Sequence, residues 1–146
     1  METAELIRAV AKEIQPDALI VIDALATVSG DRLGTSFQLT DTGITPGGGI
    51  GNHRPAINSD TLDIPVIAIG IPTVIYPHAI VSEVITKMKE QDPGLITMIK
   101  SDELLSEIMS DRLLSCAVTP KDIDITVELL ADILAESIEE AIYPNT

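Results

Sequence analysis

Two short runs of aliphatic, mostly β-branched residues constrain the fold most strongly: Ala18–Ile22 and Pro65–Gly70. Continuous apolar runs of this length, bounded by turn residues, are typical of strands buried on both faces of a parallel sheet. Helical spacing of apolar residues precedes the first run at 3–15 and follows the second at 80–89, and a looser alternation at 35–40 indicates a third strand. This order predicts an α/β fold in which helices pack on a small, mostly parallel sheet.

The C-terminal third of the chain is predicted to be helical. Residues 102–114 and 120–142 each place aliphatic side chains at helical spacing. Thr119 followed by Pro120 predicts the start of the last helix, because Thr is a favoured N-cap and Pro suits the first helical position. Since no internal repeat or linker interrupts these elements, we expect residues 1–146 to form a single α/β domain.

Composition limits the classes of partner. The chain has 23 acidic and 9 basic residues, a formal net charge of −14, and 45% apolar residues of which few are aromatic. This charge argues against nucleic acid and anionic membranes as partners, since both are bound mainly through positive charge. The single Cys116 excludes an intramolecular disulfide, and no apolar run approaches the roughly 20 residues of a membrane span. We therefore expect a cytoplasmic protein.

Polar residues with chemical potential gather between Val21 and Arg54. Asp23 follows the first apolar run, Asp41–Thr42–Gly43 follows the strand predicted at 35–40, and a glycine-rich loop comes next. Ligands of α/β proteins gather at the carboxyl ends of strands, so this stretch is the candidate site. The candidate residues are Asp23, Asp41, Thr42, Gly43, Gly47, Gly48, Gly49, Gly51, Asn52, His53 and Arg54.

Each acid has two interpretations. Asp23 either caps a following helix or is a functional acid whose pKa is tuned by burial or by a second carboxylate. Asp41 either stabilises its own turn or lines a cleft. The triplet Asp-Thr-Gly also occurs in pepsin-like proteases, but those are all-β folds, which the helical patterns of this chain oppose.

The glycine loop at 46–52 matches neither the P-loop nor the dinucleotide-binding pattern. It either binds an anion through consecutive backbone N–H groups, contacts the backbone of an extended peptide, or is simply flexible. His53 and His78 lack the spacing of metal ligands, so we expect no metal and no cofactor. A metal-dependent hydrolase that uses Asp23, Asp41 and His53 stays open as an alternative.

Several blocks in the same order closely resemble the germination protease family of endospore-forming bacteria. They are Val21–Ala26, Asp41–Ile44, Pro46–Asn52, Ile64–Val74 and Val118–Asp124. The resemblance implies an endopeptidase that degrades small acid-soluble spore proteins during germination in the spore core. It also implies a zymogen, a homo-oligomer, and a fold similar to that of hydrogenase maturation proteases (phosphorylase/hydrolase-like).

The family is usually placed among aspartic-type peptidases with two proposed catalytic acids. One of them corresponds to Asp23, and the other lies upstream of the sequence given, so the chain resembles the C-terminal portion of the enzyme and is expected to be inactive alone. The chain departs from the family at Thr27–Val28 and at Tyr76–Ala79, and the segment 89–100 is shortened. The alternative is therefore a non-enzymatic, truncated relative that binds peptides or serves in assembly.

Overall fold

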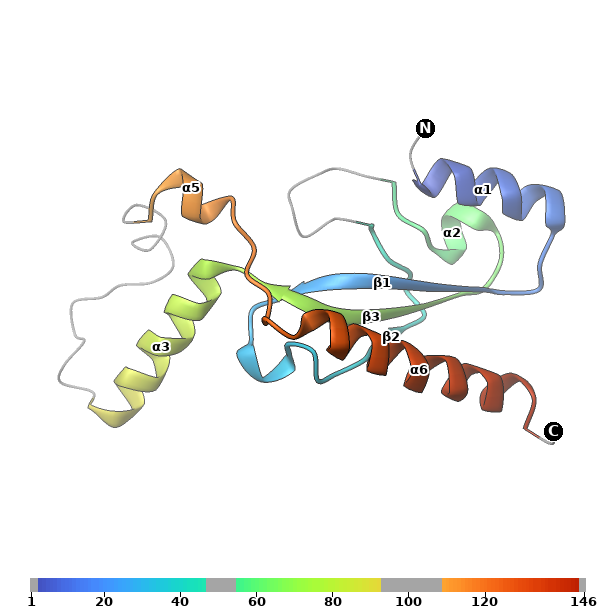
Figure 1. The fold of residues 1–146 in the computed structure, drawn as a ribbon. Helices are drawn as coiled ribbons and strands as arrows, with labels where there is room; N and C mark the ends of the chain where they lie inside the picture. Colours follow the sequence, from blue (N-terminus) through green and yellow to red (C-terminus); the bar gives the residue numbers. More distant parts are fainter. Residues whose placement is uncertain (1–2, 47–54, 93–108, 145–146) are drawn as a thin grey trace. The chain divides into compact units, whose positions relative to one another are not determined.

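The computed structural model describes residues 3–46, 55–92 and 109–144 (Figure 1). The chain divides into two compact units. The first consists of Met1–Ala26 and Ser36–Pro72, and the second consists of Thr27–Thr35 and Thr73–Thr146. The candidate residues within the described parts of the chain, Asp23, Asp41, Thr42 and Gly43, belong to the first unit.

The described strands form one three-stranded sheet in the order β1 (Leu19–Thr27), β3 (Val66–Ile75), β2 (Gln38–Thr40). β2 pairs antiparallel with β3, with Gln38 opposite Gly70 and Thr40 opposite Ala68. β1 runs in the same direction as β3 (Figure 1). The α/β class is thus confirmed, but the sheet is mixed rather than mostly parallel, because one of its two strand pairs is antiparallel.

The core of the first unit forms where α1 (Thr3–Ile14) meets α2 (Ser59–Leu62) and the sheet. Ala4, Ile57 and Val66 are buried, and half-buried aliphatic side chains pack around them. These surrounding residues are Ile7, Leu19, Val21, Ile44 and Leu62. The core is aliphatic, and it covers one face of β1.

β1 differs from its prediction in length and in burial. It runs to Thr27, five residues beyond the predicted end, and its side chains alternate in exposure instead of being buried on both faces. Ile20 and Ile22 are 38% and 52% exposed, whereas Leu19 and Val21 on the opposite face pack against the core. The prediction failed because the apolar run does not distinguish a strand with two covered faces from one with a single covered face.

β3 runs to Ile75, five residues beyond the apolar run that predicted it, which ends at Gly70, and it passes through Pro72. Proline lacks the N–H that a sheet ladder uses, so it is tolerated where no neighbouring strand needs that donor. The pairing of β3 with β2 extends only to Gly70. Pro72 lies two residues beyond the last β3 residue that pairs with β2, so it removes no hydrogen bond of that pairing.

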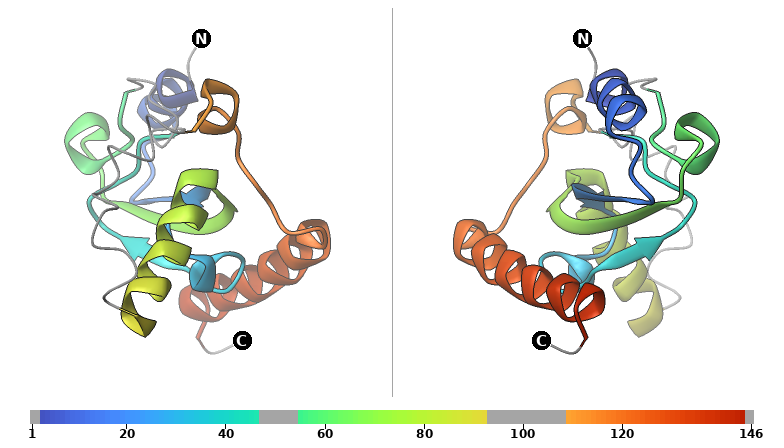
Figure 2. Two further views of the ribbon diagram at one scale, coloured as in Figure 1. Left: turned by 90° about the vertical axis from the view of Figure 1, so that its left-hand side faces the viewer. Right: turned by 90° about the vertical axis from the view of Figure 1, so that its right-hand side faces the viewer.

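The second unit contains the short 3-10 turn η1 (Gly30–Arg32) and the helices α3 (Pro77–Gln91), α5 (Asp111–Leu114) and α6 (Ile123–Ile142). An antiparallel bridge joins the end of β3 to the segment before α6, with Ile75 and Val118 exchanging two hydrogen bonds of 2.8 Å. Figure 2 shows α6 as one continuous helix close to the C-terminus. Among the described residues, no helix is both long and apolar enough to cross a membrane.

Two helix predictions need correction. α6 begins at Ile123 after a turn at Lys121–Asp122, so Thr119 is not its N-cap. The Thr119 hydroxyl instead donates a hydrogen bond of 2.9 Å to the Thr73 carbonyl in β3. The helix predicted at 102–114 is described only from residue 109, where a non-helical Ser110 precedes α5.

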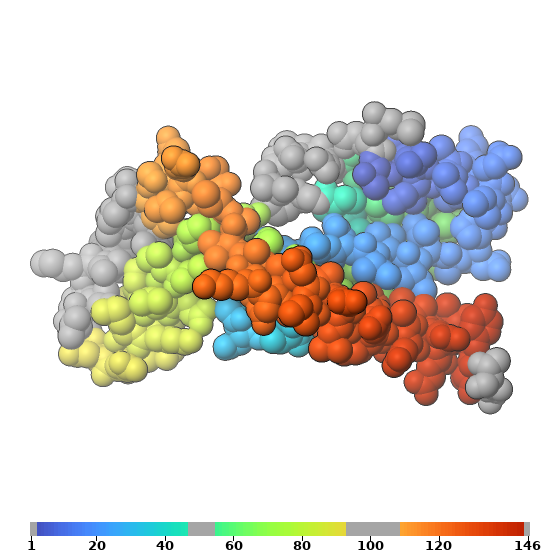
Figure 3. Space-filling view, viewed as in Figure 1, coloured from blue at the N-terminus to red at the C-terminus, as the bar shows by residue number. Residues whose placement is uncertain are grey.

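α6 carries a narrow buried stripe and a wide exposed surface. Leu130 and Leu134 are buried, while Ile125 and Leu129 are 71% and 59% exposed. The space-filling view shows one side of this helix along its length (Figure 3). The stripe at a spacing of four residues confirms the helical pattern seen in the sequence.

Candidate functional site

Asp23 lies in the middle of β1 rather than at its carboxyl end. Its side chain is half-buried and shares a strand face with Leu19 and Val21, which pack against the core. Because the chain remains extended to Thr27, no helix begins at Asp23 and the capping interpretation is wrong. Within the described residues, the Asp23 carboxylate has neither a hydrogen bond nor an ion pair.

This environment is unusual for a carboxylate. A charged group placed among apolar side chains loses hydration, and proteins normally compensate the loss with hydrogen bonds or a counter-charge. The Asp23 oxygens are not sealed from solvent, since no described side-chain oxygen is both buried and without a partner. Asp23 is therefore a carboxylate held at the edge of an apolar core and open to water or a ligand.

Leu25 fills the space next to Asp23 on the same face of β1. Gly70 of β3 has no side chain, and a Cβ there would meet Leu25 Cδ1 and lie 2.8 Å from Leu25 Cγ. The missing side chain of Gly70 thus lets Leu25 lie flat on the sheet. Because successive side chains of a strand point to opposite faces, Asp23 and Leu25, two positions apart, lie on the same face of β1.

The triplet Asp41–Thr42–Gly43 directly follows β2, as predicted. Thr40 stabilises the turn: its Oγ1 accepts a hydrogen bond of 3.1 Å from the Thr42 N–H and lies 2.7 Å from the Thr42 hydroxyl. Asp41 is exposed, and its carboxylate bonds to none of the described residues. The turn-stabilising role predicted for Asp41 is therefore wrong, and that role belongs to Thr40.

Gly43 lies near the start of the segment 41–64, and its backbone closely approaches Ile57 and Asn58 near the end of that segment. Its φ is +85°, and a Cβ there would meet the Ile57 carbonyl oxygen and lie 2.7 Å from the Asn58 Cα. The next residue, Ile44, exchanges hydrogen bonds of 2.9 and 2.8 Å with Ile57. Only glycine meets both requirements, a left-handed backbone and close approach to another chain segment.

The segment predicted as a loop at 41–64 also contains the short helix α2. Asn58 caps it: Asn58 Oδ1 accepts from the Thr61 N–H at 2.9 Å, and Thr61 Oγ1 accepts from the Asn58 N–H at 3.2 Å. The sequence contains the signal for this capping box, a capping residue followed three positions later by a side chain that bonds back. The helix places Ile57, which is 1% exposed, in the core.

Asp23 and Asp41 do not form a carboxylate pair. β3 lies between their strands, so their backbones are about 10 Å apart across the sheet alone. The two acids also lie beside different parts of β3. Thr40, next to Asp41, pairs with Ala68, whereas Leu19 bonds to Pro65 at the start of β1 and Asp23 lies four residues further along β1. Two carboxylates that share a proton lie about 3 Å apart.

The remaining candidates fall outside the described residues. They are Gly47, Gly48, Gly49, Gly51, Asn52, His53 and Arg54. Their assignment to a substrate cleft stays a prediction, and so does the metal-site alternative that involves His53. Within 3–46, 55–92 and 109–144, no three His, Cys, Asp or Glu side chains gather in a way that could hold a metal ion.

The two departures from the family pattern have local structural roles. Thr27 is 6% exposed, and its hydroxyl donates to the Ser29 carbonyl at 3.2 Å and accepts from the Ser29 N–H at 3.0 Å. The Tyr76 and His78 rings stack with their centroids 5.4 Å apart at the start of α3. Both features belong to the second unit.

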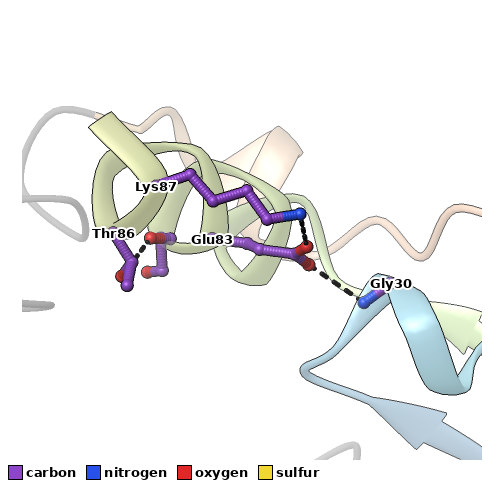
Figure 4. A network of polar contacts seen from close by, with 5 residues as sticks. Gly30, Glu83, Thr86 and Lys87 are labelled. Carbon is purple, nitrogen blue, oxygen red and sulfur yellow. Dashed lines mark hydrogen bonds and ion pairs between the residues drawn. The ribbon is translucent and has the colours of Figure 1, made fainter. Parts of the chain in front are cut away.

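A polar network in the second unit, which sequence analysis missed, joins η1 to α3 (Figure 4). Glu83 Oε2 accepts a hydrogen bond of 3.0 Å from the Gly30 N–H, and Glu83 Oε1 lies 2.7 Å from Lys87 Nζ. The Lys87 side chain, and to a smaller extent the Gly30 N–H, lower the pKa of Glu83. The hydrogen bond to Glu83 raises the pKa of Lys87. The spacing of four residues between Glu83 and Lys87 is the sequence signal for this pair.

Comparison with known proteins defines the class. The family model for germination protease matches residues 1–91, which is more than half of the chain. This chain belongs to the germination protease family.

Individual relatives extend the similarity over the whole chain. The germination protease of Clostridium tetani is 35% identical over 99% of this chain and 49% of its own length. That of Caldanaerobacter subterraneus is 36% identical over 99% of this chain and 49% of its own length. The Bacillus subtilis germination protease is 31% identical over 98% of this chain and 50% of its own length. The chain thus spans about half the length of these relatives.

Proposed function

We propose that this chain is part of an endopeptidase of the germination protease type, in which Asp23 is a catalytic carboxylate. The observation that carries the proposal is the half-buried Asp23 carboxylate, which has no hydrogen bond or ion pair to any described residue. A structural carboxylate in an apolar environment is normally paired, whereas a catalytic one must leave its oxygens available to substrate or water. Membership of the family supports the reaction class.

The proposed reaction is hydrolysis of a peptide bond by a water molecule that Asp23 helps to activate. In aspartic-type catalysis two carboxylates share one proton, so that one accepts a proton from water while the other donates one. Asp41 is separated from Asp23 by β3 and does not supply the second acid. In this proposal the second carboxylate belongs to another part of the complete protein, so this chain by itself is expected to lack activity.

The substrates in this proposal are small acid-soluble spore proteins. Asp41, Thr42 and Gly43, together with the glycine-rich loop and Asn52–Arg54, form the wall of the cleft in which the substrate lies. Gly43 supports this role because it allows the backbone to approach Ile57 closely, and the neighbouring Ile44 holds the start of the loop there by two hydrogen bonds to Ile57. Synthesis as a zymogen, a homo-oligomeric state and activity in the spore core complete the proposal.

The test is the substitution Asp23→Asn in the complete protein that contains this chain. Cleavage of a purified small acid-soluble spore protein is followed by gel electrophoresis, with Asp17→Asn as the control because Asp17 is an exposed acid just before β1. Loss of a catalytic acid–base is expected to reduce the rate by a factor of about 10² to 10⁴. Cleavage at the wild-type rate by a folded Asp23→Asn protein would remove Asp23 from the mechanism.

The second candidate is a non-enzymatic relative that binds peptides, and the departures from the family pattern at Thr27–Val28 and Tyr76–Ala79 motivate it. The two candidates differ in whether the complete wild-type protein cleaves the substrate that it binds. In a peptidase the variant retains substrate binding and loses cleavage. In a binding protein the wild type binds the spore protein without cleaving it, even when the complete protein is assayed.

A further inference from the structure

The first unit has a groove that the proposed peptidase site does not use. It has a volume of about 560 Å³ and lies where the C-terminal half of α1 faces the end of α2. One side is lined by Arg8, Ala11 and Lys12 of α1 and by Gln15 and Pro16 after it, and the other side is lined by Thr61, Leu62, Asp63 and Ile64. α1 and α2 lie side by side in the first unit (Figure 1). The groove is therefore formed within one unit.

The groove concentrates positive charge in an acidic protein. The chain has 9 basic residues against 23 acidic ones, yet Arg8 and Lys12 lie four positions apart on the same face of α1 and both line the groove. Neither side chain has an ion pair or hydrogen bond with a described residue. Like charges at this spacing destabilise a helix by about 0.2–0.5 kcal/mol, so helix stability does not account for the pair.

The helix dipole explains only one of the two cations. Lys12 lies in the last turn of α1, where positive charge compensates the partial negative charge of the carbonyl groups. Arg8 lies more than one turn before the helix end at Ile14, outside the range of this effect. Asp63 is the one acid among the groove residues, and it forms no ion pair with Arg8 or Lys12, so the two cations outnumber it.

Both helices that border the groove end in a left-handed residue. Gln15 and Asp63 have φ values of +53° and +59°, and they are the two non-glycine residues with positive φ in the described parts of the chain. Both line the groove, Gln15 just after α1 and Asp63 just after α2. A left-handed residue commonly ends a helix, and the Gln15 and Asp63 N–H groups donate hydrogen bonds of 2.8 Å to the Ala11 and Ser59 carbonyls in this way. Here they end both helices abruptly and leave the space between the helix ends open.

We propose that this groove binds an acidic peptide segment of another protein. Arg8 and Lys12 bind its carboxylates, since neither cation has a partner among the described residues and both can form charge-assisted hydrogen bonds. The half-buried Leu62 and Ile64 pack against the aliphatic part of the same segment. A free inorganic anion would use the two cations but not this apolar side, so the groove fits a peptide better. The proposal does not depend on Asp23 or on peptidase activity.

The test uses this chain and two short peptides, one of alternating Glu and Leu and one of alternating Gln and Leu. Binding is measured by calorimetry, and the binding site is located by amide chemical shifts in NMR spectra. The Glu peptide is expected to bind and to shift the resonances of Gln15 and Thr61–Ile64, and the Gln peptide is expected to bind at least about tenfold more weakly.

The variant Arg8→Gln with Lys12→Gln is expected to lose at least about tenfold in affinity for the Glu peptide. The matched control is Arg112→Gln with Lys121→Gln, which changes the net charge equally at exposed positions of the second unit and leaves the affinity unchanged. Arg8→Glu with Lys12→Glu should bind a Lys–Leu peptide instead. Equal affinities in the two Gln double variants, shifts confined to residues outside the groove, or no binding of the Glu peptide would each overturn the proposal.

Discussion

The side chain of Leu25 in β1 lies against the Cα of Gly70 in β3, in the space that a Cβ at residue 70 would occupy. This contact sets the packing on the strand face that carries Asp23. The face therefore depends on the absence of a side chain at one position of the neighbouring strand. The relationship is open to a direct test by mutation.

Gly70→Ala is expected to destabilise the fold by about 1–3 kcal/mol, because the new methyl group displaces Leu25. The free energy of unfolding is measured by urea titration. Leu25→Ala removes the obstacle, so the double variant Gly70→Ala with Leu25→Ala should lose less stability than the sum of the single variants. Additive losses would show that Leu25 and Gly70 are not in contact.

Gly43→Ala is expected to destabilise the fold by at least about 2 kcal/mol. An alanine at φ +85° is strained, and its methyl group would collide with the Ile57 backbone, which cannot move as a side chain can. Gly30→Ala is the control, because its Cβ would lie 3.2 Å from the mobile end of the Glu83 side chain. Similar urea midpoints for the two variants would contradict the close approach of Gly43 to Ile57.

Glu83 is expected to make stability depend on acid pH. Its pKa in the folded protein lies below the ordinary value of 4.5, chiefly because Lys87 bonds its carboxylate. The stabilisation by this carboxylate is therefore present above about pH 4.5 and is lost as the pH falls through the lowered pKa. The raised pKa of Lys87 acts at the alkaline end: its contribution is present below 10.5 and is lost as the pH rises through the raised value.

The measurement compares urea midpoints of the wild type and Glu83→Gln between neutral pH and pH 3. The Gln side chain still accepts the Gly30 N–H but has no charge, so the difference in stability between the two proteins should shrink as the pH falls. The effect is modest, because Lys87 is 62% exposed and surface ion pairs contribute little. Glu128→Gln on α6 is the control, and an equal pH dependence in both variants would contradict the role of Glu83.

The sequence predicted those features that depend on local patterns. The positions of α1 and of the three strands follow from the spacing of apolar residues, and the triplet at Asp41 was correctly placed after β2. The length of β1 and the passage of β3 through Pro72 depend on pairing between strands, which no local pattern contains. For the same reason the sequence placed Asp23 at a strand end, whereas the structure places it within the strand.

The network of Gly30 and Glu83 shows the same limit at longer range. The two residues are 53 positions apart, and only the fold brings the backbone N–H of one to the carboxylate of the other. The spacing of Glu83 and Lys87 was visible in the sequence, but nothing there indicated a third partner. Contacts between distant segments, rather than residue types, were the part that could not be predicted.

Asp23→Asn is expected to stabilise the folded protein by about 0.5–2 kcal/mol, because a neutral amide loses less hydration than a carboxylate on a partly apolar face. The expectation depends on Asp23 having no hydrogen bond or ion pair to a described residue. Urea unfolding of both proteins at neutral pH measures the change, with Asp17→Asn as the exposed control. A loss of stability in Asp23→Asn would show instead that the carboxylate has a structural partner, and it would weaken the case for a catalytic role. A gain in stability together with a loss of cleavage would be the pattern of an acid retained for function at a cost to the fold.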